Sequence, residues 1–243
     1  MNNLSKATLI LLLSLFCASV TAQETRYYDV EIILFENLDP QAPLSENWPA
    51  SVELELPPEK VIKIGQPYPG PIPKEFNPKY TFKPLRANEY RLNEQAAKIE
   101  ESESRRVLLH TGWRQPGMPK DTALSVYFNR QIPAAIPVAE NTIEVEGEAS
   151  KPVWRTPEAG NLEGLIKVIL ARYLHVSADI VFRPQLATAE KDIYAMEKTE
   201  DTIQPVVYRL KQTRRRMRSR ELHYLDNPLI GMLIMITPFE PKQ

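Results

Sequence analysis

The distribution of proline limits the fold of this chain more than any other feature of its sequence. The chain contains 22 prolines but only 8 glycines, and eleven of the prolines lie between Pro40 and Pro84. Each proline lacks a backbone N–H, so this stretch cannot form a regular helix or a central strand. We therefore expect residues 37–87 to form a long Pro-rich loop segment, extended over other elements or acting as a spacer.

Outside this segment, apolar residues mostly recur with the period of two that is typical of strands. Residues 26–35 alternate at first and then become fully apolar, which predicts a central strand. Its shared face carries Tyr28, Val30, Ile32 and Leu34. Residues 105–113 predict a second strand, and residues 124–132 are expected to be its pairing partner.

The C-terminal half contains further apolar stretches. Residues 164–182 predict either one long bent strand or a hairpin. Residues 205–225 predict a strand that leads into a run of arginines, and a turn at 226–228 precedes a last, very apolar strand at 229–239.

Helical signals are fewer. Residues 88–102 contain no proline or glycine and place Leu92, Ala96 and Ile99 at helical spacing. The acidic residues 190–201 are a candidate second helix, and residues 139–161 predict a loop. Because strands dominate without strict strand–helix alternation, we expect an α+β fold with a largely antiparallel sheet, one or two helices and the long Pro-rich loop.

The N-terminus has the pattern of a cleaved secretory signal. Lys6 precedes an apolar run at residues 9–18, and small residues up to Ala22 suit cleavage there. The run is shorter than the roughly 20 apolar residues of a membrane span. We expect residues 1–22 to be removed and residues 23–243 to form a single periplasmic domain. Cys17, the only cysteine, would leave with the signal, which excludes disulfides and cysteine chemistry from the mature chain.

Residues 214–220 concentrate positive charge, since five of these seven residues are arginine. The whole chain has 30 Lys+Arg and 31 Asp+Glu, so this concentration is local. An extended strand would place Arg214, Arg216, Arg218 and Arg220 on one face. Two interpretations stay open: an edge strand protected from aggregation, with arginines paired to carboxylates, or an exposed anion-binding strip. Secretion leaves no role in binding cytosolic nucleic acid.

Signals for catalysis are weak. The histidines His110, His175 and His223 show none of the short spacings of metal sites, so we expect structural roles, with Asp179 and Asp226 as nearby partners. No S-x-x-K or G-x-S-x-G motif occurs. A pair of glycosidase carboxylates has no diagnostic spacing. We expect no enzyme activity, no cofactor and no metal. A zinc hydrolase on the three histidines or a carboxylate hydrolase is the alternative.

The C-terminal stretch RRRMRSRELHYLDNPLIGMLIMITPF resembles the signature of the CsiV-like peptidoglycan-binding proteins. Three further pieces match in order: YYDVEIILFE at 27–36, RVLLHTGWRQP at 106–116 and ARYLHVSADIVF at 171–182. The resemblance implies a non-catalytic periplasmic protein that binds peptidoglycan. It also implies support of a class A penicillin-binding protein together with its outer-membrane lipoprotein activator. No site residues follow from it. Asn227 stands where the family pattern has a histidine.

From the residues themselves we expect the ligand to contact the arginine run. Those side chains, with two aromatic candidates for stacking on sugar rings, are Arg214, Arg215, Arg216, Arg218, Arg220, Trp113 and Tyr224. Both aromatic residues could equally belong to the core. His223 and Asp226 are expected to fix the turn. The alternatives are an adaptor that binds only protein, and a protein that binds anionic lipid or lipopolysaccharide.

Overall fold

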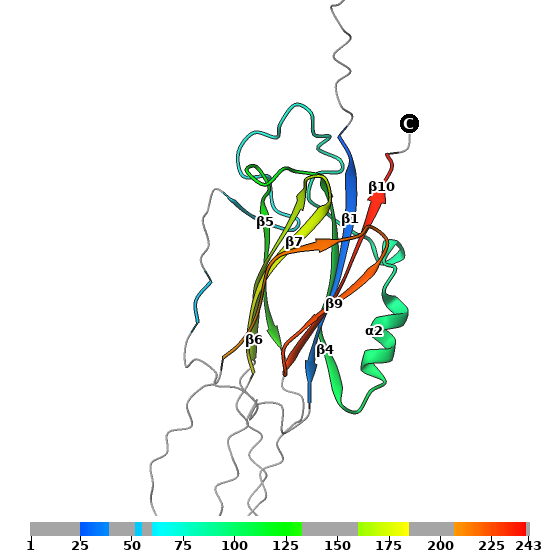
Figure 1. Cartoon of the computed structure of the whole chain (residues 1–243), viewed down its shortest axis with the longest axis vertical. Helices are drawn as coiled ribbons and strands as arrows, with labels where there is room; N and C mark the ends of the chain where they lie inside the picture. Colours follow the sequence, from blue (N-terminus) through cyan, green and yellow to red (C-terminus); the bar gives the residue numbers. More distant parts are fainter. Residues whose placement is uncertain (1–24, 39–51, 55–59, 133–159, 185–206, 242–243) are drawn as a thin grey trace, which may run out of the picture.

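The computed structural model describes residues 25–38, 52–54, 60–132, 160–184 and 207–241, which form two packed sheets and one α-helix (Figure 1). The first sheet has the order β3-β4-β1-β10-β9, with bounds Lys83–Pro84, Arg105–Pro116, Tyr27–Asn37, Ile230–Phe239 and Leu222–Asp226. The second has the order β2-β5-β6-β7-β8, with bounds Val61–Lys63, Ser125–Ile132, Gly160–Leu170, Leu174–Arg183 and Tyr208–Met217. A 3-10 turn, Ala87–Glu89, precedes the helix α2, Asn93–Glu100.

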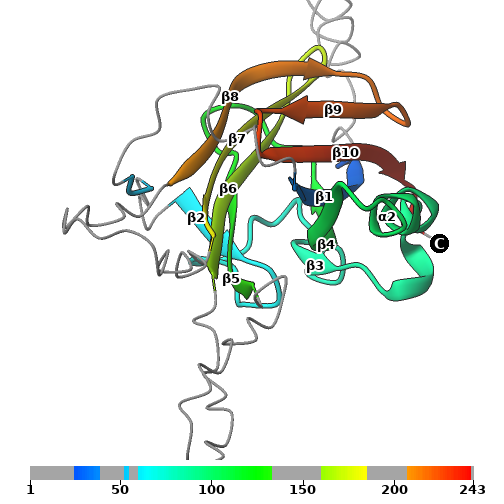
Figure 2. The same cartoon turned by 90° about the horizontal axis from the view of Figure 1, so that it is seen from below.

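The two sheets form separate layers, and α2 lies outside the first sheet (Figure 2). Every strand pair is antiparallel except β2 with β5. The expected antiparallel character is therefore confirmed, and the described residues contain one α-helix. The strands divide between two sheets, whereas the sequence led us to expect one.

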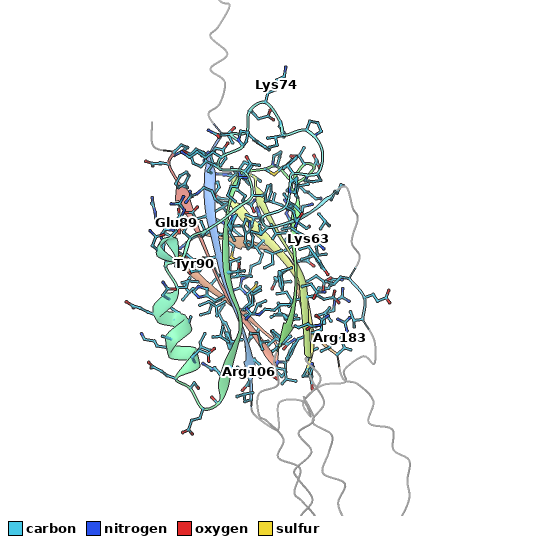
Figure 3. All side chains as sticks on the ribbon, turned by 180° about the vertical axis from the view of Figure 1, so that it is seen from behind. Lys63, Lys74, Glu89, Tyr90, Arg106 and Arg183 are labelled. Carbon is cyan, nitrogen blue, oxygen red and sulfur yellow. The ribbon has the colours of Figure 1, made fainter. Side chains whose placement is uncertain are left out.

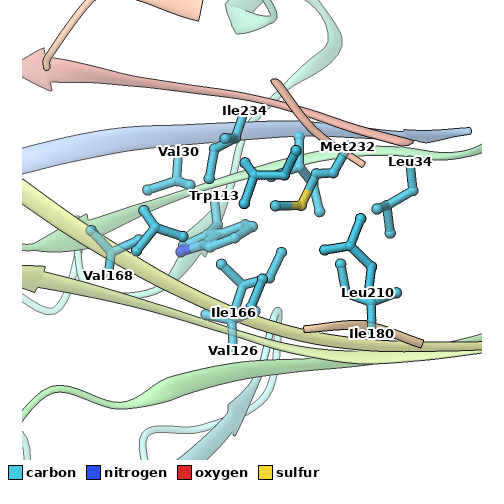
Figure 4. Packing of buried hydrophobic residues seen from close by; sticks show 14 of the residues in the cluster. Val30, Leu34, Trp113, Val126, Ile166, Val168, Ile180, Leu210, Met232 and Ile234 are labelled. Atoms are coloured by element: carbon cyan, nitrogen blue, oxygen red, sulfur yellow. The ribbon is translucent and has the colours of Figure 1, made fainter. Parts of the chain in front are cut away.

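The main core fills the space between the two sheets (Figure 4). The strand β1 is central, as predicted, and its even-numbered apolar residues point into this core. Trp113 lies in the middle of the layer with no exposed surface. The side chains labelled around it come from both sheets: Val30, Leu34, Met232 and Ile234 from the first, and Val126, Ile166, Val168, Ile180 and Leu210 from the second.

A smaller apolar cluster joins α2 to the outer face of the first sheet. Ile33 and Phe35 of β1 pack there against Leu92 and Ile99. On the same face, Glu31 is 3 % exposed, and its carboxylate accepts hydrogen bonds from the N–H groups of Arg91 (2.7 Å) and Leu92 (2.9 Å). Because helix N-termini leave N–H groups without partners, Glu31 fixes the start of α2 on the sheet.

The expected pairing of residues 105–113 with 124–132 is wrong. The strand β4 lies between β3 and β1, whereas β5 lies between β2 and β6 in the other sheet. The two strands do not pair because the chain passes to the other sheet directly after β4. Gly117 N–H donates to the Arg26 carbonyl of the first sheet (2.7 Å), and the next carbonyl, Met118, accepts from Leu170 N–H of the second (2.8 Å). The connection therefore crosses between the sheets instead of turning back.

Other sequence expectations have mixed outcomes. Residues 164–182 form a hairpin, β6 and β7. Within 88–102, the α-helix covers only Asn93–Glu100. The described part of 37–87 holds the short strands β2 and β3 among turns, and the rest of that segment lies outside the described residues. The expectations for residues 1–22 and 190–201 also lie outside them, as does most of the loop expected at 139–161, whose last two residues, Gly160 and Asn161, instead begin β6. No described helix is long and apolar enough to cross a membrane.

Candidate functional site

The arginine run connects the edge strands of the two sheets. The strand β8 ends at Met217, and β9 begins at Leu222 as the edge strand of the first sheet. His223 Nε2 accepts a hydrogen bond from Arg218 N–H (3.2 Å), and Arg220 N–H donates to the Ile236 carbonyl (2.8 Å). The connection is thus held at one edge of the sandwich, with its arginine side chains outside the core.

A β-bulge breaks the alternation that the sequence predicted for the arginines. The pairing of β7 with β8 shifts between Val176 and Ala178, and Arg214 has a φ of 45°. Leu210 and Met217 are both buried in the same core although they lie seven positions apart in the sequence, an odd number. An uninterrupted strand would point them to opposite faces, so one extra residue is needed. The bulge therefore takes Arg214 out of the regular alternation, while Arg215 and Arg216 keep it opposite Val176 and His175.

All five arginines are exposed, and their interactions within the described chain are few. Arg218 lies 3.3 Å from Glu221, an exposed pair of little energetic weight. The Arg216 guanidinium stacks over the Tyr173 ring, 3.5 Å from its centre. The guanidinium groups of Arg214, Arg215 and Arg220 form no ion pair with a described residue. Internal pairing with carboxylates therefore accounts for one of the five.

A hollow of about 360 Å³ lies between β8 and β9, beside the arginine run. Its apolar lining is Leu210 and Leu225, and its polar lining is Arg209, Lys211, Gln212, Arg215, Asp226 and Asn227. Arg209 is engaged by Asp179 through two hydrogen bonds of 2.7 and 2.6 Å. Lys211 and Arg215 remain as the cations that can meet an anion in this hollow.

Asn227 shapes the rim of the hollow. Its Oδ1 accepts hydrogen bonds from the N–H groups of Leu229 (3.0 Å) and Ile230 (2.7 Å), and its Nδ2 donates to the Arg209 carbonyl (3.0 Å). This asparagine therefore closes the turn before β10 and ties it to β8, a role that asparagine performs well in turns. The sequence pointed to His223 and Asp226 for this task. Asp226 instead bonds Tyr224, and burial together with this carboxylate raises the pKa of the Tyr224 hydroxyl.

The aromatic candidates have different positions. Trp113 is fully buried, and its Nε1 donates to Gln115 (2.8 Å), so it offers no ring face to a ligand. Tyr224 is 46 % exposed and stacks on Phe35, on the outer face of the first sheet. Tyr173, which sequence reasoning did not select, is 39 % exposed beside Arg216. Tyr173 lies in the turn between β6 and β7, so the hairpin alternative for residues 164–182 was the signal that could have found it.

The three histidines do not meet. His110 lies on the outer face of the first sheet, with Nε2 2.8 Å from Glu31. Its ring stacks on Tyr90, which is labelled beside α2 in Figure 3. His175 belongs to the second sheet and His223 to the edge strand β9. No group of three metal-ligating side chains exists among the described residues. The zinc site considered for these histidines is thus not formed.

Comparison with known proteins gives one match. The model of the family described as "Peptidoglycan-binding protein, CsiV" covers residues 5–239, nearly the whole chain. The chain belongs to the CsiV family. No curated protein and no solved structure matches it. The part matched by the CsiV model includes both walls of the hollow and the whole arginine run.

Proposed function

We propose that this CsiV-family chain binds peptidoglycan in the periplasm, without chemistry of its own, through the β8–β9 edge. The observation that carries the proposal is the set of five exposed arginines, of which one has a carboxylate partner among the described residues. The contacts are assigned to the arginine run and to Lys211 in the neighbouring hollow. Tyr173 and Tyr224 are the aromatic rings available for sugars, and Trp113 is excluded by its burial.

Peptidoglycan suits this surface chemically. Its stem peptides present free carboxylates at regular intervals along a polymer. Guanidinium groups bind carboxylates through paired, charge-assisted hydrogen bonds and stay charged at every physiological pH. Single exposed pairs contribute about 0.2–1 kcal/mol each. Several pairs on one polymer add because the second contact becomes intramolecular.

The family resemblance supports two further parts of the proposal. Export through a signal at residues 1–22 would place the chain beside its ligand. Support of a class A penicillin-binding protein and its outer-membrane lipoprotein activator would give the binding a role in wall synthesis. Exposed Leu222 and Tyr224, on the outer face of the first sheet, offer the apolar surface that such a protein contact needs.

Co-sedimentation with purified sacculi tests the proposal. Residues 23–243 are compared with a variant that changes Arg214, Arg215 and Arg218 to Gln. The matched control changes three exposed lysines away from the β8–β9 edge, Lys74, Lys83 and Lys98, to Gln, which removes the same charge. We expect the wild type and the control to pellet alike, and the arginine variant to lose at least about five-fold in affinity.

Four outcomes would change the proposal. If both variants pellet like the wild type, peptidoglycan binding lies elsewhere on the chain. If the wild type stays in solution but captures the purified penicillin-binding protein or the activator, the chain is a protein adaptor. If it binds sacculi but neither protein, the partner role is wrong. Release of soluble muropeptides from the sacculi would show enzyme activity.

A further inference from the structure

We propose a second anion-binding site, formed by Lys60, Lys120 and Lys167 on the outer face of the second sheet. It takes carboxylates of the same polymer as the arginine run. This inference rests on the proposed function and extends it, because the ligand then spans the sheet from β8 to β2. We call these three lysines the lysine site.

Strand register places the lysine site and the arginine run in one row. Lys167 of β6 pairs with Ser125 of β5 on one side and with Ser177 of β7 on the other. The Ser177 hydroxyl accepts a hydrogen bond from Arg214 N–H of β8 (3.0 Å). Neighbouring strands are about 4.8 Å apart, so the backbones at Lys167 and Arg214 are separated by about 10 Å. That is close enough for one ligand to touch both.

The other two lysines come from the elements beside this row. Lys60 immediately precedes β2, whose first residue, Val61, pairs with Ser125. Lys120 lies in the connection from β4 to β5, and that connection is tied to the end of β6 by the Leu170–Met118 hydrogen bond (2.8 Å). Three separate segments of the chain thus bring their cations to the same corner of the sheet.

These lysines repel one another and have no ion pair within the described chain. The pKa of Lys167 is lowered, first by its partial burial and then by the positive charges of Lys60 and Lys120. The neighbouring carboxylate Asp121 acts in the opposite direction without reversing the shift. A bound carboxylate would relieve this repulsion, because an opposite charge nearby favours the protonated lysine.

The other end of the same sheet face is neutralised internally. Arg183 lies 2.6 Å from Glu163, and Arg209 lies 2.6 Å from Asp179. Arg183 is labelled near the lower end of the second sheet in Figure 3. Accumulated cations are therefore not a general property of this sheet, and they occur beside the arginine run.

Between the two groups, His175 adds a polar atom without a partner. It pairs with Arg216 in the register of β7 and β8 and lies two residues before Ser177 on β7. Its Nδ1 is buried and makes no hydrogen bond within the described chain. A ligand that crosses from the arginines to the lysines would pass over the His175 side chain, whose Nδ1 lies below the surface.

The lysine site is tested with a variant that changes Lys60, Lys120 and Lys167 to Gln. It is compared with the arginine variant, with a variant that combines all six changes, and with the control changed at Lys74, Lys83 and Lys98. Three probes are used: intact sacculi, soluble disaccharide-peptides released from them, and vesicles of anionic phospholipid. Thermal unfolding checks the fold, and we expect no loss of stability in the lysine variant because its repulsion is removed.

If one polymer engages both sites, either triple variant loses at least about five-fold in affinity for sacculi, and the combined variant loses binding altogether. The soluble fragments lack the repeated carboxylates of the polymer, so on them each triple variant loses at most about three-fold. A lysine variant that pellets like the wild type, while the arginine variant does not, overturns the lysine site alone. So does a lysine variant that loses binding only to anionic phospholipid vesicles. A wild type that fails to pellet overturns both proposals.

Discussion

At the scale of single residues, the candidate site depends on cations that the fold leaves without carboxylate partners. The sequence left open whether the arginine run is exposed or paired internally with carboxylates, and the structure shows all five side chains exposed. The exclusion of Trp113 did not follow from the sequence either. Trp113 and Tyr224 occupy similar strand positions in the sequence, and only the packing of the second sheet over Trp113 separates a core ring from an exposed one.

Arg214 allows binding to be separated from folding. Its φ of 45° is a left-handed conformation that costs a non-glycine residue about 1 kcal/mol. We therefore expect Arg214→Gly to leave the free energy of unfolding unchanged or to raise it by up to about 1 kcal/mol. The same variant should bind sacculi more weakly, because a guanidinium is lost. Urea denaturation and sacculus co-sedimentation measure the two effects.

The control for this variant is Arg130→Gly, at an exposed residue within β5 that does not belong to the proposed site. Glycine there should destabilise the protein by about 0.5–1 kcal/mol and leave sacculus binding unchanged. A loss of stability at Arg214 as large as at Arg130 would contradict the strained geometry of the bulge. Unchanged binding by Arg214→Gly would remove Arg214 from the site.

At the scale of elements, period-two patterns located most strands but not their partners. Residues 26–35 and 229–239 became β1 and β10 with small shifts at their ends. The partner of β4 could not be predicted, because it depends on a connection that crosses between sheets through two backbone hydrogen bonds. The bulge in β8 did leave a signal: Leu210 and Met217 are apolar residues an odd number of positions apart. That spacing requires an extra residue if both enter one core.

The placement of α2 depends on one buried carboxylate, and this gives a prediction for the element. Glu31→Ala should lower the free energy of unfolding by about 3 kcal/mol, because His110 and two backbone N–H groups lose their shared partner. The control is Glu94→Ala, at an exposed residue in the first turn of α2, which should cost less than about 1 kcal/mol. Equal effects in urea denaturation would show that α2 is held by its apolar contacts alone.

At the scale of the whole molecule, the distribution of charge matters more than its sum. Removal of residues 1–22, as we propose, would leave 29 Lys+Arg and 31 Asp+Glu, a net charge of −2. A protein with this charge is not drawn over long distances to a polymer that carries carboxylates. Binding must arise from local cations that come within a Debye length, about 10 Å at 0.1 M salt, of their targets.

Sacculus binding should therefore weaken strongly with salt, in proportion to the number of local contacts. Raising NaCl from about 0.05 M to about 0.5 M should lower the affinity of the wild type at least about ten-fold. The arginine variant and the lysine variant should each show a shallower salt dependence than the wild type. The control changed at Lys74, Lys83 and Lys98 should follow the wild type, because its charge is lost away from the ligand. Titrations of sacculi at four salt concentrations measure these slopes. Salt does not screen contacts between neutral groups. If binding of the wild type does not change with salt, recognition therefore rests on hydrogen bonds and on the exposed rings of Tyr173 and Tyr224.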